Sequence, residues 1–189
     1  MSYRKKVSLI RCDITSLPVD AIVNSANKSL LGGGGLDYII HKKAGSQMKD
    51  ACIELHQQKG GCKTGQAEVT IAGDLPAQFV IHAVGPRWLD GQHSETELLC
   101  SAYASALGKA EEVQATTVSF PSISTGIYRF PKQLAAEIAI GTVLSTLLNY
   151  AFIEHVFFVC DDLDNFKIYQ SILSQLHDDK IGILIEEEK

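Results

Sequence analysis

Short apolar runs of strand length alternate along this chain with longer segments whose apolar residues recur at helical spacing. The segment VDAIVNSAN, at 19–27, is a nearly continuous apolar run, which is typical of a strand that is covered on both faces. Strands that alternate with helices form layered structures, because each helix buries its apolar face against a sheet. We therefore expect a three-layer α/β/α sandwich with a mixed, mostly parallel sheet.

The expected elements follow one another without a repeat, a linker or a low-complexity segment. The turn DLPAQ separates strands 67–73 and 78–85, and this hairpin-like pair indicates a sheet that is not purely parallel. Ser94 and Glu97 have the spacing of a capping box, so a long helix should begin there. The length of 189 residues predicts one domain, 1–189. Further strands are expected at 6–12, 19–27, from 116, at 155–160 and from 181, and further helices at 36–45, 46–61, 132–150 and 165–179.

The net charge of −5 argues against a nucleic-acid-binding or acidic-membrane-binding surface, because polyanion binding normally needs clustered Lys and Arg. The basic run RKK, at 4–6, is expected to be a solvated edge. A small anionic ligand is still allowed, since backbone N–H groups can bind it without any cationic side chain.

Five widely spaced cysteines without a C-x-x-C pattern predict free buried thiols in a reducing compartment. The histidines and cysteines show no metal-ligand spacing, so we predict no structural metal, and we expect no cofactor. The first residues, MSYRKKVSLIRCD, lack the apolar centre of a signal peptide, and no apolar run approaches a membrane span. We therefore expect a cytoplasmic protein. The cysteines are Cys12, Cys52, Cys62, Cys100 and Cys160.

Four consecutive glycines, Gly32–Gly35, follow the apolar run and precede a helical pattern. Glycine costs backbone entropy on folding, so four in a row indicate that a ligand needs close access to the main chain. A second loop without bulky residues at its start, 122–131, follows the strand that begins at 116. Ligands of open α/β sheets bind beyond the carboxyl ends of strands, and each loop leads into a helix whose N-terminus favours negative charge.

Neither loop has a known nucleotide-binding motif. No Lys-Ser or Lys-Thr follows the glycines, which excludes a P-loop, and Asp37 stands where G-x-G-x-x-G needs its last glycine. Two uncharged loops that face each other suit a diphosphate better than a triphosphate.

Five segments together resemble a macrodomain of the MacroD type and, within that type, the bacterial O-acetyl-ADP-ribose deacetylases. The resemblance runs in order from about residue 5 to about residue 177, and the combination of the N-x-A-N stem, the glycine run and the STGIY loop is highly specific. The segments are CDITSLPVDAIVNSAN, LLGGGGLDYIIHKKAG, CKTGQAEVTIAGDLP, IHAVGP and FPSISTGIYRFP.

The resemblance implies an ADP-ribose-binding hydrolase that deacetylates O-acetyl-ADP-ribose and removes ester-linked mono-ADP-ribose from acidic side chains of proteins. The implied partners are ADP-ribose, O-acetyl-ADP-ribose and mono-ADP-ribosylated proteins. We expect neither nucleic acid nor membrane as a partner. A monomer is expected because no heptad or spare apolar stripe remains in the sequence.

Site residues of the family match particular positions of this chain. Asp13, with Ile14 beside it, resembles the aspartate that accepts a hydrogen bond from the adenine amino group. Asn27 resembles the asparagine that orients the distal ribose, and Asp37 resembles the proposed proton acceptor. The loop backbone against the phosphates and ribose is matched by Gly35 and Leu36. The diphosphate loop is matched by Ser124, Thr125, Gly126, Ile127 and Tyr128, of which the last also lies near the distal ribose.

The residue types fit that chemistry. An asparagine offers a donor and an acceptor to a ribose hydroxyl, but it is no base at neutral pH. Asp37 can orient the ribose or accept a proton from water, and its place at a helix start favours the ionised form, which is a weak base. We therefore expect modest turnover, with much of the rate coming from the positioning of the ester and a water, aided by a substrate phosphate.

Simpler roles remain open for the same residues. Asp37 fits a helix N-cap, and Asp13 fits a turn or a cap. Asn24 and Asn27 also fit a purely structural role, in which their side chains hydrogen-bond the backbone of the loop and contact no ligand. Two histidines in apolar surroundings are expected to be hydrogen-bonded core residues rather than catalysts: His41 and His82.

Five positions depart from the family pattern. Cys12 replaces a usual glycine before the adenine-binding aspartate, and Tyr38 stands where a small residue is common, which predicts a narrower rim. Arg129 and Phe130 stand where the family loop usually reads Gly-Tyr, and Arg129 is expected to add a cation near the phosphates or the distal ribose. Asp161 replaces an aromatic residue that family members often place beside the adenine, and Phe166 is a candidate to substitute for it.

Two other functions compete with ester hydrolysis. A non-catalytic module that reads ADP-ribose would bind the ligand without turnover, although readers often lack the pair Asn27 and Asp37. A nucleotide phosphohydrolase would need metal-binding carboxylates, and the sequence has no cluster of them.

Overall fold

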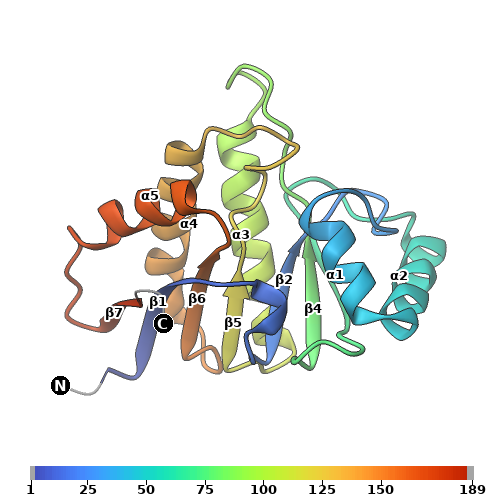
Figure 1. Ribbon diagram of the computed structural model, residues 1–189, viewed down its shortest axis with the longest axis horizontal. Coiled ribbons are helices and arrows are strands. Elements are labelled where there is room, and N and C mark those ends of the chain that lie inside the picture. The colour runs from blue at the N-terminus through green and yellow to red at the C-terminus, as the bar shows by residue number, and fades with distance from the viewer. Residues whose placement is uncertain (1–2, 187–189) are drawn as a thin grey trace.

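Residues 3–186, which the computed structural model describes, contain a seven-stranded sheet with helices on both faces (Figure 1). The strand order is β3-β4-β2-β5-β6-β1-β7, and each neighbouring pair is parallel except β3 and β4. The expected α/β/α sandwich with a mixed, mostly parallel sheet is confirmed. The strands are β1 (Lys5–Arg11), β2 (Ala21–Ser25), β3 (Ala67–Ile71), β4 (Phe79–Ala83), β5 (Thr117–Phe120), β6 (His155–Cys160) and β7 (Ile181–Glu186). The α-helices are α1 (Leu36–Ala44), α2 (Ser46–Lys59), α3 (Glu95–Glu112), α4 (Lys132–Thr146) and α5 (Leu163–Leu173), and the 3-10 turns are η1 (Ile14–Ser16) and η2 (Leu147–Asn149).

Strand β2 lies inside the sheet and is packed on both faces, as its continuous apolar run predicts. Ala21 and Val23 point to the side of α3, and Ile22 points to the opposite side. Because side chains alternate along a strand, Asn24 lies on the same face as Ile22. The sequence of β2 thus places one buried amide under the layer of α1 and α2.

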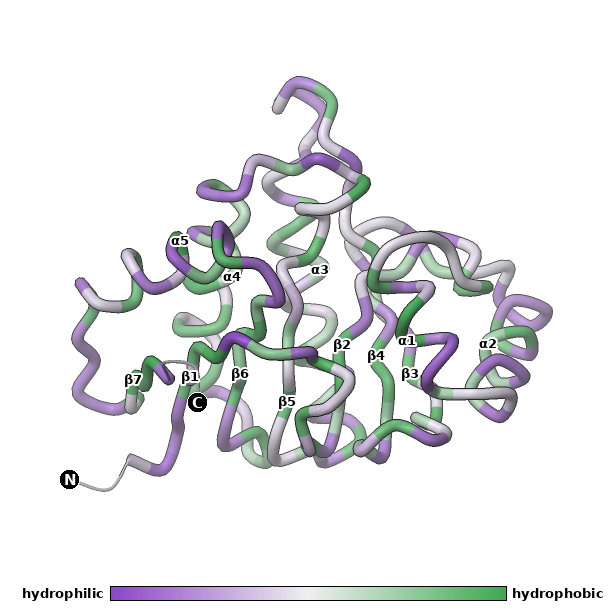
Figure 2. Tube along the Cα trace, in the orientation of Figure 1, coloured by the Kyte–Doolittle hydropathy of each residue, from purple (hydrophilic) through white to green (hydrophobic). Residues whose placement is uncertain are grey.

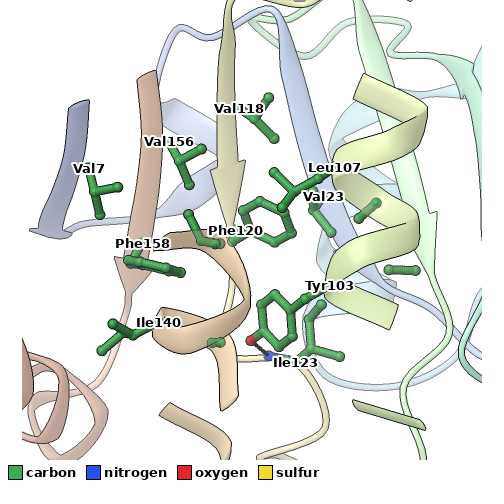
Figure 3. Packing of buried hydrophobic residues seen from close by; sticks show 14 of the residues in the cluster. Val7, Val23, Tyr103, Leu107, Val118, Phe120, Ile123, Ile140, Val156 and Phe158 are labelled. Atoms are coloured by element: carbon green, nitrogen blue, oxygen red, sulfur yellow. Dashed lines mark hydrogen bonds between the residues drawn. The ribbon is translucent and has the colours of Figure 1, made fainter. Parts of the chain in front are cut away.

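The larger part of the hydrophobic core lies between the sheet and helices α3, α4 and α5 (Figure 3). Aromatic rings run through it in series, with centroid distances of 5.3 Å from Tyr103 to Phe120, 6.5 Å from Phe120 to Phe158, and 5.2 Å from Phe158 to Tyr169. Each fully buried large side chain contributes roughly 1.5–3 kcal/mol to folding. This packing fixes β5 and β6 against the helices, and the loops that follow these two strands carry the site.

On the other face, α1 and α2 cover a smaller apolar cluster. Ile40 from α1 and Met48 from α2 pack with Ile22 and Val80 from the sheet, and all four side chains are fully buried. Gly45, with φ of 82°, separates the two helices, and its backbone N–H still donates to the carbonyl oxygen of His41. The glycine predicted as the end of the first helix therefore has that position.

Strands β3 and β4 form the expected antiparallel pair, with Ala67 opposite Ala83 and Ile71 opposite Phe79. Strand β3 is an edge of the sheet. The pair therefore accounts for the mixed character that the DLPAQ turn predicts.

Helix α3 begins where the sequence predicts, but not by the predicted capping box. Ser94 has a left-handed backbone, with φ of 58°, and its side chain caps nothing. Glu95 is buried instead, and its carboxylate accepts the backbone N–H groups of Leu89, Asp90, Gly91 and His93. Desolvation raises the pKa of Glu95, but these donors outweigh it and bring the pKa to about 2.

Two helices differ in extent from the prediction. Helix α5 begins at Leu163 because Asp162 caps it by accepting the N–H of Asn165, and it ends at Leu173 rather than continuing to residue 179. Asp178 instead accepts the N–H groups of Lys180 and Ile181 in the turn before β7. Helix α4 ends at Thr146, where the turn η2 begins, and residues 187–189 of the predicted last strand lie outside the described part.

Hydrophobic residues follow the strands through the middle layer, whereas much of α2 is hydrophilic (Figure 2). Among residues 3–186, no helix combines the length and the apolar character that a membrane crossing requires. All five cysteines are free, as the sequence predicts, but the expected burial is wrong for two of them, because Cys12 is only half-buried and Cys100 is exposed.

Candidate functional site

A cleft of about 860 Å³ opens beyond the carboxyl ends of β1, β2, β5 and β6. Its walls come from the segments that follow these strands, which is the usual place of a ligand in an open α/β sheet. The volume suits a ligand of nucleotide size.

All the residues that the resemblance assigns to a site lie in the lining of this one cleft. They come from three separate parts of the chain, and the parallel strands bring these parts to the same edge of the sheet. Their roles toward a ligand stay predictions. The residues are Asp13, Ile14, Asn27, Gly35, Leu36, Asp37, Ser124, Thr125, Gly126, Ile127 and Tyr128.

Asn27 shapes the glycine loop from inside. Its Nδ2 donates to the carbonyl oxygen of Gly32 at 2.9 Å, and its Oδ1 accepts from the backbone nitrogen and the hydroxyl of Ser29, at 3.1 and 2.7 Å. A Cβ on Gly33 would lie 3.0 Å from Nδ2 of Asn27 and 3.1 Å from Oδ2 of Asp37. A side chain at position 33 would therefore crowd both polar groups, and Asn27 also satisfies loop backbone.

The two loops face each other with unused donors. Among residues 3–186, no hydrogen bond engages the backbone N–H groups of Gly33–Gly35 or of Gly126–Tyr128. The loops also approach closely, since a Cβ on Gly34 would lie 2.9 Å from Cδ1 of Ile127. Six uncharged N–H groups on opposite rims make an anion site of the kind that backbone nests provide.

The second loop is anchored by a residue that the sequence analysis missed. The hydroxyl of Tyr103, in the middle of α3, accepts the N–H of Ile123 at 3.1 Å (Figure 3). It also donates to the carbonyl oxygen of Pro121 at 3.3 Å. Burial raises the pKa of Tyr103 to about 12, so the hydroxyl keeps its proton. No sequence signal distinguishes Tyr103 from an ordinary core aromatic.

Gly85 was missed as well. A Cβ at this position would lie 2.1 Å from Oγ of Ser124 and 2.6 Å from Cγ2 of Ile123. Ser124 itself has φ of 67°, a left-handed backbone that turns the loop. In the sequence, a glycine before Pro86 indicates a special position, but it does not indicate that Ser124 and Ile123 pack against it.

Asp37 is the second residue of α1, and its side chain is not the N-cap of that helix. The N-cap is Gly35, and no side chain caps the helix there, so the capping role left open for Asp37 is wrong. Asp37 is 5% exposed, and its Oδ1 accepts from Nδ2 of Asn24 at 2.7 Å, with Nε2 of His41 at 3.3 Å. The carboxylate is thus held from behind while it lines the cleft.

Asp13 lies at the far end of the cleft and combines two roles. It caps η1 by accepting the N–H and the hydroxyl of Thr15, at 2.9 and 2.6 Å, and it also lines the cleft. Lys43, which the sequence analysis did not single out, donates to Oδ2 of Asp13 at 2.6 Å. The hydrogen bonds from Lys43 and Thr15 lower the pKa of Asp13, so this carboxylate is ionised at neutral pH.

Three expectations about positions that depart from the family pattern are wrong, because each of these side chains lies outside the cleft lining. Tyr38 is 57% exposed and is not part of the lining, so it does not narrow the rim. Arg129 is exposed too and is not part of the lining, whose two cations are Arg87 and Lys132; the guanidinium carbon of Arg87 lies 5.1 Å from the centroid of the Tyr128 ring. Phe166, on α5, is buried in the larger hydrophobic cluster and is not part of the lining.

At the end of the cleft near Asp13, the lining is polar rather than aromatic. Cys12 and Asp161 line it, as their positions predict, together with Asp162 and Asn165. Asn165 donates to Oδ2 of Asp162 at 2.8 Å. The aromatic residue in the lining is Tyr128, which belongs to the loop 122–131 and not to the segment around Asp161.

Behind Asp37, a row of polar groups is buried beneath α1 and α2. Asn24 and His82 are both 0% exposed and are register partners on β2 and β4. Nδ2 of Asn24 lies 3.2 Å from Nδ1 of His82, and Nε2 of His82 lies 2.9 Å from the hydroxyl of Thr70. His82 is thus the hydrogen-bonded core histidine that the sequence predicts, whereas the same prediction is wrong for His41, which is half-buried and whose Nε2 makes no hydrogen bond within residues 3–186.

Three side chains here have the atom types of a metal site. His41, Cys52 and His82 place ligand atoms within 4.8 Å of one another. Both ring nitrogens of His82 already have hydrogen-bond partners, and burial raises the pKa of the Cys52 thiol to about 11, which opposes the thiolate that a metal needs. The arrangement favours hydrogen bonding over metal binding.

Comparisons with known proteins agree with this geometry. The Macro domain family model matches residues 23–139. A Macro domain-containing protein of Acinetobacter sp. (strain ED45-25) is 65% identical over 181 residues, covering 96% of this chain and 99% of that protein. The O-acetyl-ADP-ribose deacetylase of Escherichia coli (strain K12) is 46% identical over 176 residues, covering 93% and 99%. A mutant Oceanobacillus iheyensis macrodomain with ADPR superposes with a TM-score of 0.84 at 36% identity, covering 90% and 93%. By the match to the family model over residues 23–139 and by these identities over nearly the whole length, the chain belongs to the Macro domain family.

Proposed function

We propose that this protein binds ADP-ribose and hydrolyses ester-linked adducts of it: O-acetyl-ADP-ribose, and mono-ADP-ribose attached to acidic side chains of proteins. The observation that carries the proposal is the meeting of Asn27 and Asp37 around Gly33, at a cleft rimmed by two loops with unused N–H groups. The similarity to O-acetyl-ADP-ribose deacetylases and to a macrodomain with ADPR bound supports the binding of ADP-ribose and the deacetylation of O-acetyl-ADP-ribose.

In this proposal the diphosphate lies between the glycine loop and the loop 122–131. The backbone N–H groups of both rims bind its oxygens, and Arg87 adds a positive charge at the mouth of the cleft. Asp13 accepts from the adenine amino group through a lone pair that Thr15 and Lys43 leave unused. The distal ribose then extends toward Asn27 and Asp37.

For the chemical step, the carboxylate of Asp37 accepts a proton from a water molecule as the oxygen of that water attacks the ester carbonyl carbon. The bond between this carbon and the ribose oxygen breaks, and the ribose oxygen takes up the proton as it leaves. Acetate, or the free acidic side chain, is the second product. Asn27 holds the ribose hydroxyls, so that positioning supplies most of the rate.

The same step serves both substrates, because each is an ester of the distal ribose. We expect the step to proceed without a metal, since it needs only a proton acceptor and an oriented water. The side of the cleft at Ile127 is open, with this side chain 61% exposed, which leaves space for a protein substrate to approach. We also propose that residues 1–189 form one domain and that the protein is a cytoplasmic monomer.

The test is a time course of hydrolysis, followed by mass spectrometry, on O-acetyl-ADP-ribose and on a protein that carries ester-linked mono-ADP-ribose. Wild type is compared with Asn27→Ala, Asp37→Ala and Asp37→Asn, with and without EDTA. We expect activity in EDTA, and a loss of roughly a hundredfold or more in kcat for Asp37→Asn, which keeps the shape but removes the proton acceptor.

Calorimetry with ADP-ribose separates binding from turnover in the same variants. Equal rates in wild type and the variants would remove Asn27 and Asp37 from the mechanism. Tight binding of ADP-ribose without hydrolysis of either ester would make the protein a reader module. Hydrolysis of the free acetyl ester alone would restrict the substrate class to the metabolite.

A further inference from the structure

We propose that His82 is a positioning residue for the hydrolytic site, acting on Asp37 through Asn24. The inference rests on the proposed function, because it assigns a task to a group behind the proposed proton acceptor. It goes beyond that function because His82 is fully buried and does not line the cleft.

The three side chains form a direct line from the sheet to the helix. Asn24 and His82 are register partners on β2 and β4, and both point to the face that α1 and α2 cover. One nitrogen, Nδ2 of Asn24, lies 2.7 Å from Oδ1 of Asp37 and 3.2 Å from Nδ1 of His82. A single amide therefore connects the carboxylate to the imidazole.

The chemistry of the groups fixes the direction of every hydrogen bond in this line. A carboxylate only accepts, so the NH2 end of the Asn24 amide must face Asp37. The same NH2 group can only donate to His82, so Nδ1 of His82 carries no proton and is the acceptor. Nε2 then carries the proton and donates to the hydroxyl of Thr70 at 2.9 Å.

The line ends on the backbone of the edge strand. The hydroxyl of Thr70 donates its own hydrogen to the carbonyl oxygen of Ile71 at 3.1 Å. Its oxygen is therefore free to accept from His82, which selects the Nε2–H tautomer. From β3 to α1, every hydrogen bond in this series thus joins one donor to one acceptor.

A neutral His82 is required for this arrangement, and its surroundings favour one. Burial, assisted by the nearby His41, lowers the pKa of His82 to about 4, although Asp37 acts in the opposite direction. The other titratable group in contact is the thiol of Cys52 on α2, 3.6 Å from Nε2. Glu68 on β3 is the register partner of His82, but its carboxylate accepts from Lys59 at the surface.

The consequence for Asp37 is orientational. Oδ1 is taken up by Asn24, so Oδ2 is the oxygen that remains for the water, near Gly33. Without an acceptor at His82, the NH2 group of Asn24 keeps only its bond to Asp37, so nothing fixes the angle at which the amide meets the carboxylate. The carboxylate would then rotate, and a misplaced proton acceptor lowers kcat more than it weakens ligand binding.

Two substitutions of nearly equal size separate positioning from bulk packing. His82→Asn keeps an acceptor near the place of Nδ1, whereas His82→Gln keeps a polar group near Nε2 and removes the acceptor that faces Asn24. We expect kcat for O-acetyl-ADP-ribose to fall about tenfold or more in His82→Gln and to stay within about threefold of wild type in His82→Asn. KM and the Kd for ADP-ribose should change by less than about threefold in both.

Cys52→Ala is the matched control, because Cys52 touches His82 but neither Asn24 nor Asp37, and it should leave kcat unchanged. Equal kcat in wild type and His82→Gln would overturn the proposal, and so would an equal fall in both His82 variants. A loss shared by Cys52→Ala would assign the effect to packing and would also overturn it.

A second measurement tests the role of His82 even if the wild-type protein hydrolyses no ester. The 15N shifts of His82 at neutral pH, in ADP-ribose-free protein, should report a neutral ring with its proton on Nε2. A proton on Nδ1 would overturn the proposal whatever the enzyme does. The absence of turnover in wild type, with the Nε2–H form present, would instead count against the hydrolase function alone.

Discussion

The hydroxyl of Tyr103 lies 3.1 Å from the backbone nitrogen of Ile123 and 3.3 Å from the carbonyl oxygen of Pro121. Through these contacts α3, which covers the face of the sheet opposite α1 and α2, holds the start of the loop 122–131. The hydrogen bonds are fully buried, so the peptide groups have no solvent to replace a lost partner.

Tyr103→Phe should therefore weaken both the fold and the ligand site. An unpaired buried N–H costs about 1–3 kcal/mol, which should appear in the free energy of unfolding measured with urea. The Kd for ADP-ribose, by calorimetry, should rise several-fold because the loop loses its anchor. Gly108→Ala on the same helix is the control, since a Cβ there meets nothing within 4 Å. An unchanged Kd in Tyr103→Phe would contradict the anchoring role.

Gly33→Ala should reduce turnover more than stability. The added Cβ would lie 3.0 Å from Nδ2 of Asn27 and 3.1 Å from Oδ2 of Asp37, and both side chains would have to move. We expect kcat to fall about tenfold or more, with a change in unfolding free energy of less than about 1 kcal/mol. Gly141→Ala, at a position with open space, serves as control. Wild-type kcat in Gly33→Ala would mean that the proximity of Asn27 and Asp37 has no part in the reaction.

Asp13→Ala should remove the preference for adenine. A carboxylate accepts from the amino group of adenine but repels the oxygen that hypoxanthine carries at the same place. The Kd for ADP-ribose should rise about tenfold, while the Kd for inosine diphosphate ribose should change little. Calorimetry with the two ligands checks this. An equal loss for both would show that Asp13 acts only as the cap of η1.

The stability of the protein should fall as the pH is lowered from 7 to 4, in part because of His82. The pKa of His82 is about 4 in the folded protein and about 6.5 in the unfolded chain, so only the unfolded chain takes up this proton in between. The contribution to the free energy of unfolding is about 3 kcal/mol, present above pH 6.5 and lost toward pH 4.

Urea unfolding of wild type and His82→Asn at several pH values measures this difference. The variant lacks the titrating group, so its stability should depend less steeply on pH over the same interval. Parallel curves for the two proteins would mean that His82 titrates normally and is not buried as a neutral ring.

Much of the fold follows from local pattern. The apolar run of β2 predicts a strand covered on both faces, and the DLPAQ turn predicts the antiparallel pair of β3 and β4. Helix ends were less predictable, because they depend on contacts outside the helix. Ser94 has capping chemistry but a left-handed backbone, and Asp178 takes N–H groups from the turn before β7, which leaves α5 to end at Leu173.

For the site, motifs identified the residues that line the cleft but not those that support it. Asn24 and His82 meet only because β2 and β4 are neighbours in register, and no local pattern encodes that pairing. Tyr103 is indistinguishable from a core residue until its hydroxyl is seen against Ile123. The position of Arg129 within the loop predicts a cation at the cleft, whereas Arg87 is remote from the loop in sequence and lies beside Tyr128 in space.

The close approach of Ile127 to Gly34 ties together two loops that are remote along the chain. A side chain at position 34 would displace Cδ1 of Ile127, the flexible end of a side chain that is 61% exposed. Variants that aim to widen or close the entrance for bulkier esters should therefore be designed with both positions in view.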